Sequence, residues 1–541
     1  MHWRQTLVVP LCVLGIVLGG NGAHEQVPFA PSCDCPPQGI HSTRPWDARL
    51  STDATGNLVF QSLASLLQVG PNSKHNNGHS IVRASIPEGT LLYHGRANKE
   101  PPTRDWIALD SEHSQFFAAG ANGTLFTFTT TRELQFLYFD GCSANKFDGV
   151  VDTQDVLFWD EVDYDPQDDW FAELARMDRM CEWGQQYGID GIVRMQYNFE
   201  IMYCDVWNGG LQLISTASLV ATDGMIFANP RKTTSTPSTL QDTAGVFAWV
   251  LPSPIGRLPP APREPMIPPE GWKGSLPTTA EEVIHTGAWH NAGEVRIQVD
   301  PSTMISFYDP ALTSLVEARR LSKRKEYRLA GISKEDVSRV QADVAEMMNR
   351  DPSAKSGVDW QALARVIQDW FSDRLPYIHH FLHQPFSNAS AQAVIVRRAI
   401  YVSLLPYMGR DNVGTPDWYA HMAEGCATRY IAHLPMAKFT KQEYLLHNAI
   451  QEVLHEICRV YTVAWRDAFD VEEQSAHSTV QLLVKWRGEF DALIEWLDWP
   501  AWMKCDPPCG ADEFCRWSQY AVWESDPKPE PRCISVTTIK F

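Results

Sequence analysis

The sequence predicts an α+β domain of small, mostly antiparallel sheets with helices, followed by an all-α helical domain and a small disulfide-rich tail. Three observations predict this order. Short β-rich runs dominate residues 55–228, apolar residues recur with a 3.6-residue period across residues 291–500, and four cysteines fall within residues 501–541. A chain of 541 residues, 44% of them hydrophobic, is long enough for two or three domains with sizeable cores.

Residues 1–23 are typical of a secretory signal peptide. Arg4 supplies a positive start, and a short apolar run over residues 7–18 is followed by small residues suited to cleavage. Because the run is short and contains Pro10, a cleaved signal is favoured over its alternative, an uncleaved anchor. Residues 24–54 read as an extended, proline-containing leader. We therefore expect a secreted, extracellular protein with no membrane span once the signal is removed.

Glycosylation motifs and cysteine content agree with that location. Asn122 and Asn388 each begin an Asn-x-Ser/Thr acceptor. Of the twelve cysteines, Cys12 lies in the signal, so eleven remain, and this odd number leaves at least one thiol unpaired or bonded to another molecule. The disulfide candidates are Cys33, Cys35, Cys142, Cys181, Cys204, Cys426, Cys458, Cys505, Cys509, Cys515 and Cys533.

The charge balance is acidic, with 65 Asp and Glu against 46 Lys and Arg and a net charge of −19. Binding to phosphate groups needs a positive field, so this balance disfavours nucleic acid or an anionic membrane as the main partner. The expected partner is an unidentified protein or small molecule.

Residues 55–228 contain the elements of the predicted α+β domain. Residues 58–67 and 170–187 have helical spacing. Short β-rich runs bounded by turn residues cover 90–93, 125–129, 134–139, 191–195, 199–205 and 211–215. Residues 152–169 hold eight acidic residues and no basic one, which predicts a solvated loop.

A proline-rich linker over residues 229–290 cannot bury a core and is expected to be extended or irregular. Two short strands at 295–299 and 304–308 follow it and are expected to return to the first sheet. The periodic apolar runs of the helical domain, residues 291–500, cover 340–348, 360–370, 391–404, 443–469 and 474–497.

Two segments 106 positions apart are the best candidates for chemistry. Residues 89–96 read Gly-Thr-Leu-Leu-Tyr-His-Gly-Arg, and residues 197–205 read Tyr-Asn-Phe-Glu-Ile-Met-Tyr-Cys-Asp. Each places one polar residue, His94 or Glu200, in an otherwise apolar strand, where a buried charge is costly unless it is paired or used. The alternatives are a satisfied core histidine and an edge strand with a solvated glutamate. Gly95 lets a ligand approach the backbone closely.

Together these segments resemble the His–Tyr–Glu pattern of the ADP-ribosyltransferase superfamily, in the form nearest to poly-ADP-ribose polymerases. The resemblance implies that His94 hydrogen-bonds a ribose hydroxyl and orients NAD, and that Gly95 holds the nicotinamide amide through its backbone. It implies that Phe116 or Phe117 stacks on the ring. It also implies that Glu200 binds the ribose 2′-hydroxyl and stabilises an oxocarbenium-like transition state. The aromatic is Phe where that family has Tyr, so a pseudo-enzyme is an alternative.

The whole chain also resembles a group of uncharacterised secreted fungal proteins that carry Tyr-His-Gly-Arg, Tyr-Phe-Asp-Gly and Phe-Glu-Ile-Met segments. Three functions follow as hypotheses. The first is an NAD-dependent ADP-ribosyltransferase or NAD glycohydrolase, with NAD as its substrate. The second is a non-catalytic secreted scaffold or binding protein with a degenerate transferase-like domain. The third is a carbohydrate-active hydrolase, for which Asp160, Glu161 and Glu200 supply carboxylates.

No metal site is expected from the sequence. His379 and His383 have the i, i+4 spacing of metal ligands, and His380 lies between them, but prolines bracket the segment and no HExxH motif accompanies it. Lys323 and Arg324 form either a dibasic processing site or part of a solvated helix face.

Overall fold

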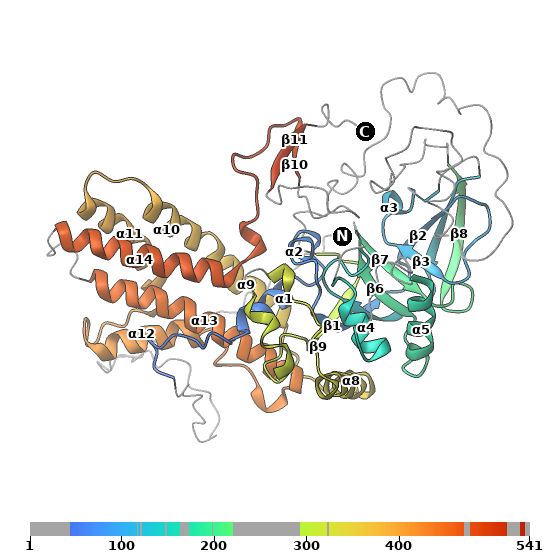
Figure 1. Ribbon diagram of the computed structural model, residues 1–541, viewed down its shortest axis with the longest axis horizontal. Helices are drawn as coiled ribbons and strands as arrows, with labels where there is room; N and C mark the ends of the chain where they lie inside the picture. The colour runs from blue at the N-terminus through green and yellow to red at the C-terminus, as the bar shows by residue number, and fades with distance from the viewer. Residues whose placement is uncertain are drawn as a thin grey trace, which may run out of the picture. The chain divides into compact units, whose positions relative to one another are not determined.

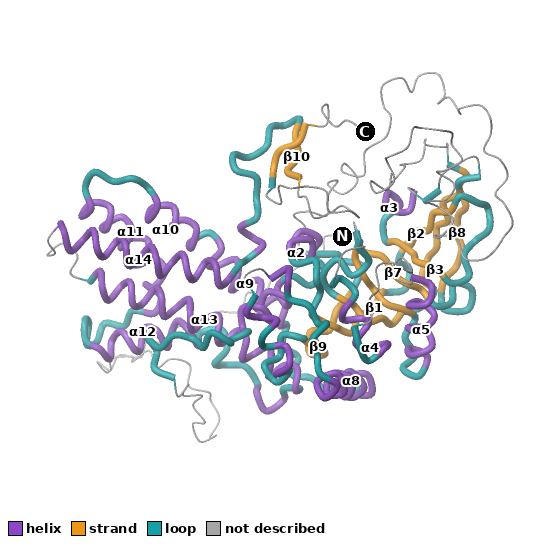
Figure 2. The backbone as a smooth tube through the Cα atoms, viewed as in Figure 1, coloured by secondary structure: helices purple, strands orange, loops and turns teal. Residues whose placement is uncertain are grey.

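The computed structural model describes residues 44–115, 117–118, 122–145, 149–162, 173–196, 198–219, 293–321, 324–469, 476–516 and 531–535. The predicted signal peptide, residues 24–43 of the predicted leader and the predicted proline-rich linker lie outside these residues. Figure 1 shows the described helices and strands in chain order, and Figure 2 separates helix, strand and loop.

One nine-stranded sheet forms the α+β part, with strand order β8-β4-β2-β3-β7-β6-β5-β1-β9. Its strands are β1 (Ser80–Ile86), β2 (Leu91–Arg96), β3 (Asp105–Ala108), β4 (Thr124–Thr130), β5 (Leu134–Phe139), β6 (Gly191–Met195), β7 (Phe199–Tyr203), β8 (Leu211–Ser218) and β9 (Gln298–Ser306). In the described sheet only β5 and β6 run parallel, and the other neighbouring pairs are antiparallel. This arrangement confirms the predicted mostly antiparallel α+β class.

The segment after the linker returns to this sheet, as predicted, but as one strand. β9 pairs with β1, and the register shifts between Ile81 and Arg83. The two short runs expected at 295–299 and 304–308 correspond to the two ends of this interrupted strand. Because a shift of this kind leaves residues unpaired between two paired stretches, a sequence pattern reads it as two strands.

The sheet buries both faces, because successive side chains of a strand point to opposite sides. On β1, Val82 packs into a core that continues into the helical part of the chain, while Ile81 packs into a second core on the other face. The helices of the second core are α4 (Asp152–Trp159), α5 (Glu173–Gln185) and α8 (Lys334–Asn349). The first core includes α1 (Gly56–Ala64), and the short α2 (Val69–Lys74) and α3 (Ser111–Gln115) complete the helices of this part.

The helical part confirms the predicted all-α region. Its helices besides α8 are α9 (Trp360–Ser372), α10 (Arg374–His383), α11 (Ala389–Leu404), α12 (Pro416–Thr428), α13 (Lys441–Ala468) and α14 (Ala476–Leu497). The 28-residue α13 begins at a capping box in which Thr440 and Glu443 each accept a backbone N–H of the other. α13 contacts α1, α11, α12 and α14 as well as β9 (Figure 1), so the first described helix packs against a helix near the other end of the chain.

Four disulfides occur among the described residues. Cys181–Cys204 joins α5 to the residue after β7, and Cys426–Cys458 joins α12 to α13. In the tail, Cys505–Cys515 and Cys509–Cys533 staple the hairpin of β10 (Glu513–Arg516) and β11 (Arg532–Ser535), which confirms the disulfide-rich tail. The predicted candidates Cys33 and Cys35 lie outside the described residues.

Including Cys142 among the disulfide candidates was wrong. Cys142 is a free thiol that is completely buried, and its Sγ lies 3.4 Å from the carbonyl oxygen of Asn72. Burial raises the pKa of this thiol to about 12, so it stays protonated and behaves as a small apolar side chain.

The acidic stretch also differs from the prediction in its first half. Residues 152–159 form α4, and Asp152 and Asp155 are buried. Asp152 accepts a hydrogen bond of 2.8 Å from Arg328, and Asp155 pairs with Arg176. Partners that are distant in sequence neutralise these acids, which a local charge count does not detect.

Among the described helices, none combines the length and the apolar character that crossing a membrane requires.

Candidate functional site

The sheet brings His94 and Glu200 into one neighbourhood. His94 lies on β2 and Glu200 on β7, and β3 is the strand between them. Tyr93, next to His94, is opposite Ala108 of β3, and Ala108 is opposite Glu200. Two segments 106 positions apart in the sequence therefore lie two strands apart in the sheet.

An aromatic cluster connects the two residues. The Trp106 ring, on β3, packs against the His94 ring with 4.8 Å between centroids and against the Phe117 ring with 4.5 Å. Trp106 also stacks on His113 of α3, with centroids 5.6 Å apart. His113 in turn places its Nε2 atom 3.4 Å from Oε2 of Glu200. We call these five residues, His94, Trp106, His113, Phe117 and Glu200, the His–Trp–Glu cluster.

His94 is held in one tautomer by the backbone. Its Nδ1 donates to the carbonyl oxygen of Trp106 over 2.7 Å, so in the neutral ring Nε2 carries the lone pair. Burial lowers the pKa of His94 to about 3, with a further contribution from the charge of Arg96. In the described part of the chain Nε2 makes no hydrogen bond, although it lies 3.5 Å from Oδ2 of Asp105. His94 is thus a neutral ring with one available acceptor.

Asp105 is the carboxyl group that faces this acceptor. Burial raises the pKa of Asp105 to about 7, against the opposing charge of Arg96 and the hydrogen bond that Trp106 N–H donates to Oδ1 over 2.9 Å. Near neutral pH a large fraction of Asp105 therefore keeps its proton.

Glu200 is held by an ion pair inside the sheet. Its Oε1 atom accepts a hydrogen bond of 2.6 Å from Nε of Arg194, which lies directly opposite on β6. Arg194 also donates to Glu173 over 2.8 Å. Since only 2% of Glu200 is exposed, this pairing is what makes its burial possible.

Gly95 is required by the packing of α3 on β2. A Cβ atom at this position would lie 1.8 Å from the carbonyl oxygen of Ser114, so no other residue allows α3 to approach this closely. The Ser114 hydroxyl is buried and has no hydrogen-bond partner among the described residues. Phe117 continues the chain from α3 into the aromatic cluster, and Phe116 lies outside the described residues.

The cluster reaches the surface through its aromatic members. His94, His113 and Glu200 are buried, whereas Trp106 and Phe117 are only partly buried.

Several residues of this candidate site could not be identified from the sequence. Trp106 and Asp105 lie on β3, whose four residues are too short for a clear alternating pattern. His113 lies on a helix of five residues, and Arg194 was read only as part of a strand. The one available signal was the arginine placed in the otherwise apolar β6, which indicates a buried partner of opposite charge.

The other two predicted carboxylates, Asp160 and Glu161, differ from Glu200 in burial. Asp160 and Glu161 are exposed at the end of α4, and Asp160 accepts a hydrogen bond from Gln341. Glu200 is buried, whereas Asp160 and Glu161 are exposed. Glu200 and either of these acids therefore do not resemble a pair of carboxylates that face one groove. The predicted glycosylation residues, Asn122 and Asn388, are both exposed, and Asn388 caps α11 by accepting the N–H of Ala391 over 3.1 Å.

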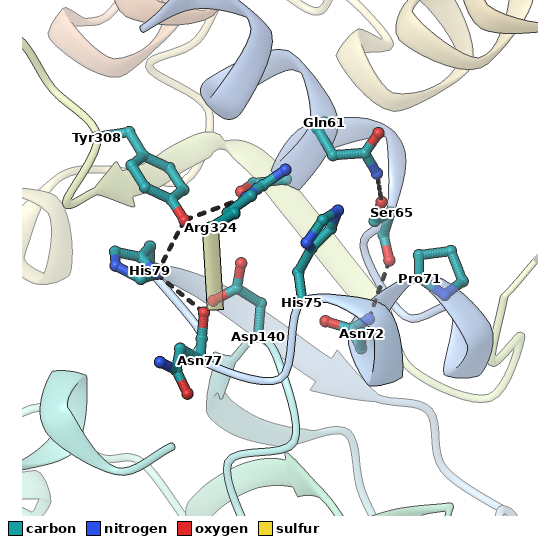
Figure 3. A pocket seen from close by; sticks show the side chains of 11 residues that line it. Gln61, Ser65, Pro71, Asn72, His75, Asn77, His79, Asp140, Tyr308 and Arg324 are labelled. Carbon is teal, nitrogen blue, oxygen red and sulfur yellow. Dashed lines mark hydrogen bonds between the residues drawn. The ribbon is translucent and has the colours of Figure 1, made fainter. Parts of the chain in front are cut away.

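A small polar cavity lies where α1 and α2 meet the sheet (Figure 3). Tyr308 stacks on His79 with 4.3 Å between centroids, and Arg324 donates to the Tyr308 hydroxyl over 3.3 Å. Asp140 faces the same space, and burial raises its pKa to about 6. The cavity has a volume of about 10 Å³, which matches one water molecule and no larger ligand. Arg324, from the predicted dibasic pair, is therefore partly buried here, while Lys323 lies outside the described residues.

A wider cavity of about 510 Å³ lies between the start of β9 and the loop before α9. Its lining mixes the acids Glu294 and Asp300 with the bases Lys355 and Arg365, and Lys355 pairs with Asp300 over 2.9 Å. None of the described residues that line these two cavities belongs to the His–Trp–Glu cluster.

The fold and the cluster define a protein with a mixed sheet, a buried histidine–glutamate site and an extensive helical region. The YPL277C N-terminal domain is the family whose model matches residues 47–124 and 117–238, which contain β1 to β8 and the whole cluster. The chain is 24% identical over 524 residues to the uncharacterized protein YOR389W of Saccharomyces cerevisiae, covering 84% of this chain and 80% of that protein.

A second yeast protein, the uncharacterized protein YPL277C, is 30% identical over 209 residues, which cover 30% of this chain and 43% of that protein. No solved structure matches the chain significantly. The predicted similarity to uncharacterised fungal proteins is confirmed.

Proposed function

We propose that the His–Trp–Glu cluster binds NAD and cleaves the bond between nicotinamide and ribose, as an NAD glycohydrolase or an ADP-ribosyltransferase. One observation carries the proposal. The residues that the superfamily resemblance singled out, His94, Gly95, Phe117 and Glu200, come from three separate segments and converge on one cluster. A purely structural use of each residue does not require them to meet.

Glu200 supplies the electrostatic part of the proposed reaction. The hydrogen bond from Arg194 holds the carboxylate in place before substrate arrives. Oε2, which faces His113 at 3.4 Å, is the oxygen that would accept the ribose 2′-hydroxyl once His113 moves aside. A fixed negative charge beside C1′ stabilises the oxocarbenium-like transition state.

The remaining residues bind and orient the substrate. The free acceptor Nε2 of His94 suits a ribose hydroxyl, and Asp105 is close enough to exchange a proton with the same atom. The unpartnered Ser114 hydroxyl and the backbone of Gly95 suit a carboxamide group. Phe117 and Trp106 offer the faces against which a flat pyridine ring stacks.

The proposed reaction balances with water as the acceptor. The C1′–N bond breaks, and its electron pair leaves with nicotinamide. Water forms the new C1′–O bond and releases one proton, so NAD⁺ and water give ADP-ribose, nicotinamide and H⁺. In the transferase version a nucleophile on another molecule replaces water.

The test measures NAD binding by calorimetry and nicotinamide release by chromatography for the purified full-length chain and for Glu200→Gln. We expect release by the wild type and a loss of at least about 100-fold in Glu200→Gln, with both proteins assayed at a temperature at which circular dichroism shows them folded. The matched control is Glu112→Gln on α3. The Glu112 side chain is exposed, so this substitution should leave nicotinamide release unchanged. A folded wild-type chain that neither binds NAD nor releases nicotinamide would overturn the proposal, as would full activity in Glu200→Gln.

The second candidate is a non-catalytic scaffold or binding protein with a degenerate transferase-like domain. The burial of Glu200 and the contacts to both of its carboxylate oxygens favour it, because a purely structural carboxylate would look the same. The same experiment separates the two, since NAD binding without release supports the degenerate site.

We also propose that the protein is secreted and glycosylated at Asn122 and Asn388. The four disulfides and the exposure of both asparagines support this proposal. Expression in a fungal host, followed by N-terminal sequencing and enzymatic removal of N-glycans, tests it. Retention of the chain in the cells with no mass change on deglycosylation would contradict it.

A further inference from the structure

Two neighbouring helices bring three potential metal ligands together far from the His–Trp–Glu cluster in sequence. His379 and His383 lie one turn apart on α10, and their rings pack with 4.2 Å between centroids. α14 contacts α10 (Figure 1) and contributes Asp491. The spacing of two histidines at i and i+4 is common in metal sites on helices, and the third ligand comes from a different helix.

The atoms converge on a small volume. Nε2 of His383 lies 2.9 Å from Oδ1 of Asp491, and Nε2 of His379 lies 3.3 Å from the same oxygen. The three ligand atoms all lie within 4.8 Å of one another. In a tetrahedral site with metal–ligand distances of about 2.0–2.1 Å, neighbouring donor atoms are about 3.3 Å apart. The two measured separations are close to that value.

The three ligands share one carboxylate oxygen and are open to solvent. Nε2 of His379 and Nε2 of His383 both face Oδ1 of Asp491. Each side chain is 41% exposed, so an ion can enter from solvent.

We propose that His379, His383 and Asp491 form a binding site for a divalent transition-metal ion, with Zn²⁺ as the preferred ion. Two imidazole nitrogens and one carboxylate oxygen are a ligand set typical of zinc, and three protein ligands leave a position for water. The ion clamps α10 to α14.

Calorimetric titration of the EDTA-treated full-length protein with ZnCl₂ tests the site. We expect one ion per chain and an affinity at least tenfold weaker in His379→Ala, His383→Ala and Asp491→Asn. The matched control is His380→Ala. His380 lies on the same helix, its side chain is exposed, and it is not one of the three proposed ligands. Its affinity should equal that of the wild type.

A spectroscopic readout makes the test independent of other weak sites on the chain. Co²⁺ in a site with nitrogen and oxygen ligands has visible d–d absorption, which we expect in the wild type and in His380→Ala but not in the double variant His379→Ala/His383→Ala. Zn²⁺ should also raise the unfolding temperature of the wild type and not that of the double variant. Equal binding by wild type and double variant, or no saturable binding by the wild type, would overturn the proposal.

Discussion

Arg194 and Glu200 lie directly opposite each other on β6 and β7 and share a hydrogen bond of 2.6 Å inside the sheet. Both side chains are about 5% exposed or less, so each charge depends on the other for its stability. This pair holds Glu200 in the His–Trp–Glu cluster. Its contribution to stability does not depend on whether the cluster is catalytic.

Replacing Arg194 by Met should destabilise the fold by about 3–5 kcal/mol, because it leaves the buried Glu200 carboxylate without its cation. The free energy of unfolding in urea measures this change. The double variant Arg194→Met/Glu200→Met removes both charges and should recover most of the loss. If the double variant is as unstable as the single one, packing and not charge pairing stabilises this region.

Asp105 should make the stability depend on pH in a definite direction. Burial raises its pKa in the folded protein to about 7, above its ordinary value of 3.8, so its favourable contribution is present below pH 3.8 and is lost as pH rises through 7. The stability of Asp105→Asn relative to wild type should therefore increase from pH 5 to about pH 7, by on the order of 1 kcal/mol per pH unit, and level off at higher pH. Urea unfolding of both proteins at each pH measures this difference, which a constant offset would contradict.

Gly95→Ala should displace α3, because the new Cβ would collide with the carbonyl oxygen of Ser114. We expect a loss of about 1–3 kcal/mol in unfolding free energy and faster hydrogen exchange in α3. Gly488→Ala on α14 is the matched control, since nothing lies within 4 Å of its added Cβ. That substitution should stabilise the protein by up to about 1 kcal/mol. Equal stability changes in the two variants would contradict the close contact at Gly95.

Cys142 should resist alkylation in the native protein and react only after unfolding, because its thiol is buried and its pKa is raised to about 12. Differential alkylation followed by mass spectrometry without reductant measures this and also maps the disulfides. The expected disulfide-linked peptides contain Cys181–Cys204, Cys426–Cys458, Cys505–Cys515 and Cys509–Cys533. A disulfide-linked peptide that contains Cys142 would contradict the assignment.

Prediction from the sequence succeeded where the signal was local and periodic. The 3.6-residue apolar period located α8, α9, α11, α13 and α14, and the short β-rich runs located β2 and β4 to β8. It failed where an element was short or its partner was remote. β3 has four residues, and the buried acids of α4 are neutralised by Arg328 and Arg176, which no local pattern associates with them.

The sequence by itself determined the classes of elements, their order, and the choice of His94 and Glu200 as unusual polar residues in apolar strands. Only the tertiary structure decided which residues meet, because strand order and helix packing join positions that are remote in sequence. It placed Trp106 and His113 between His94 and Glu200, paired Glu200 with Arg194, and set Asp491 beside His379. Those contacts, which form only when the sheet and the helices close, decide the chemistry available to each side chain.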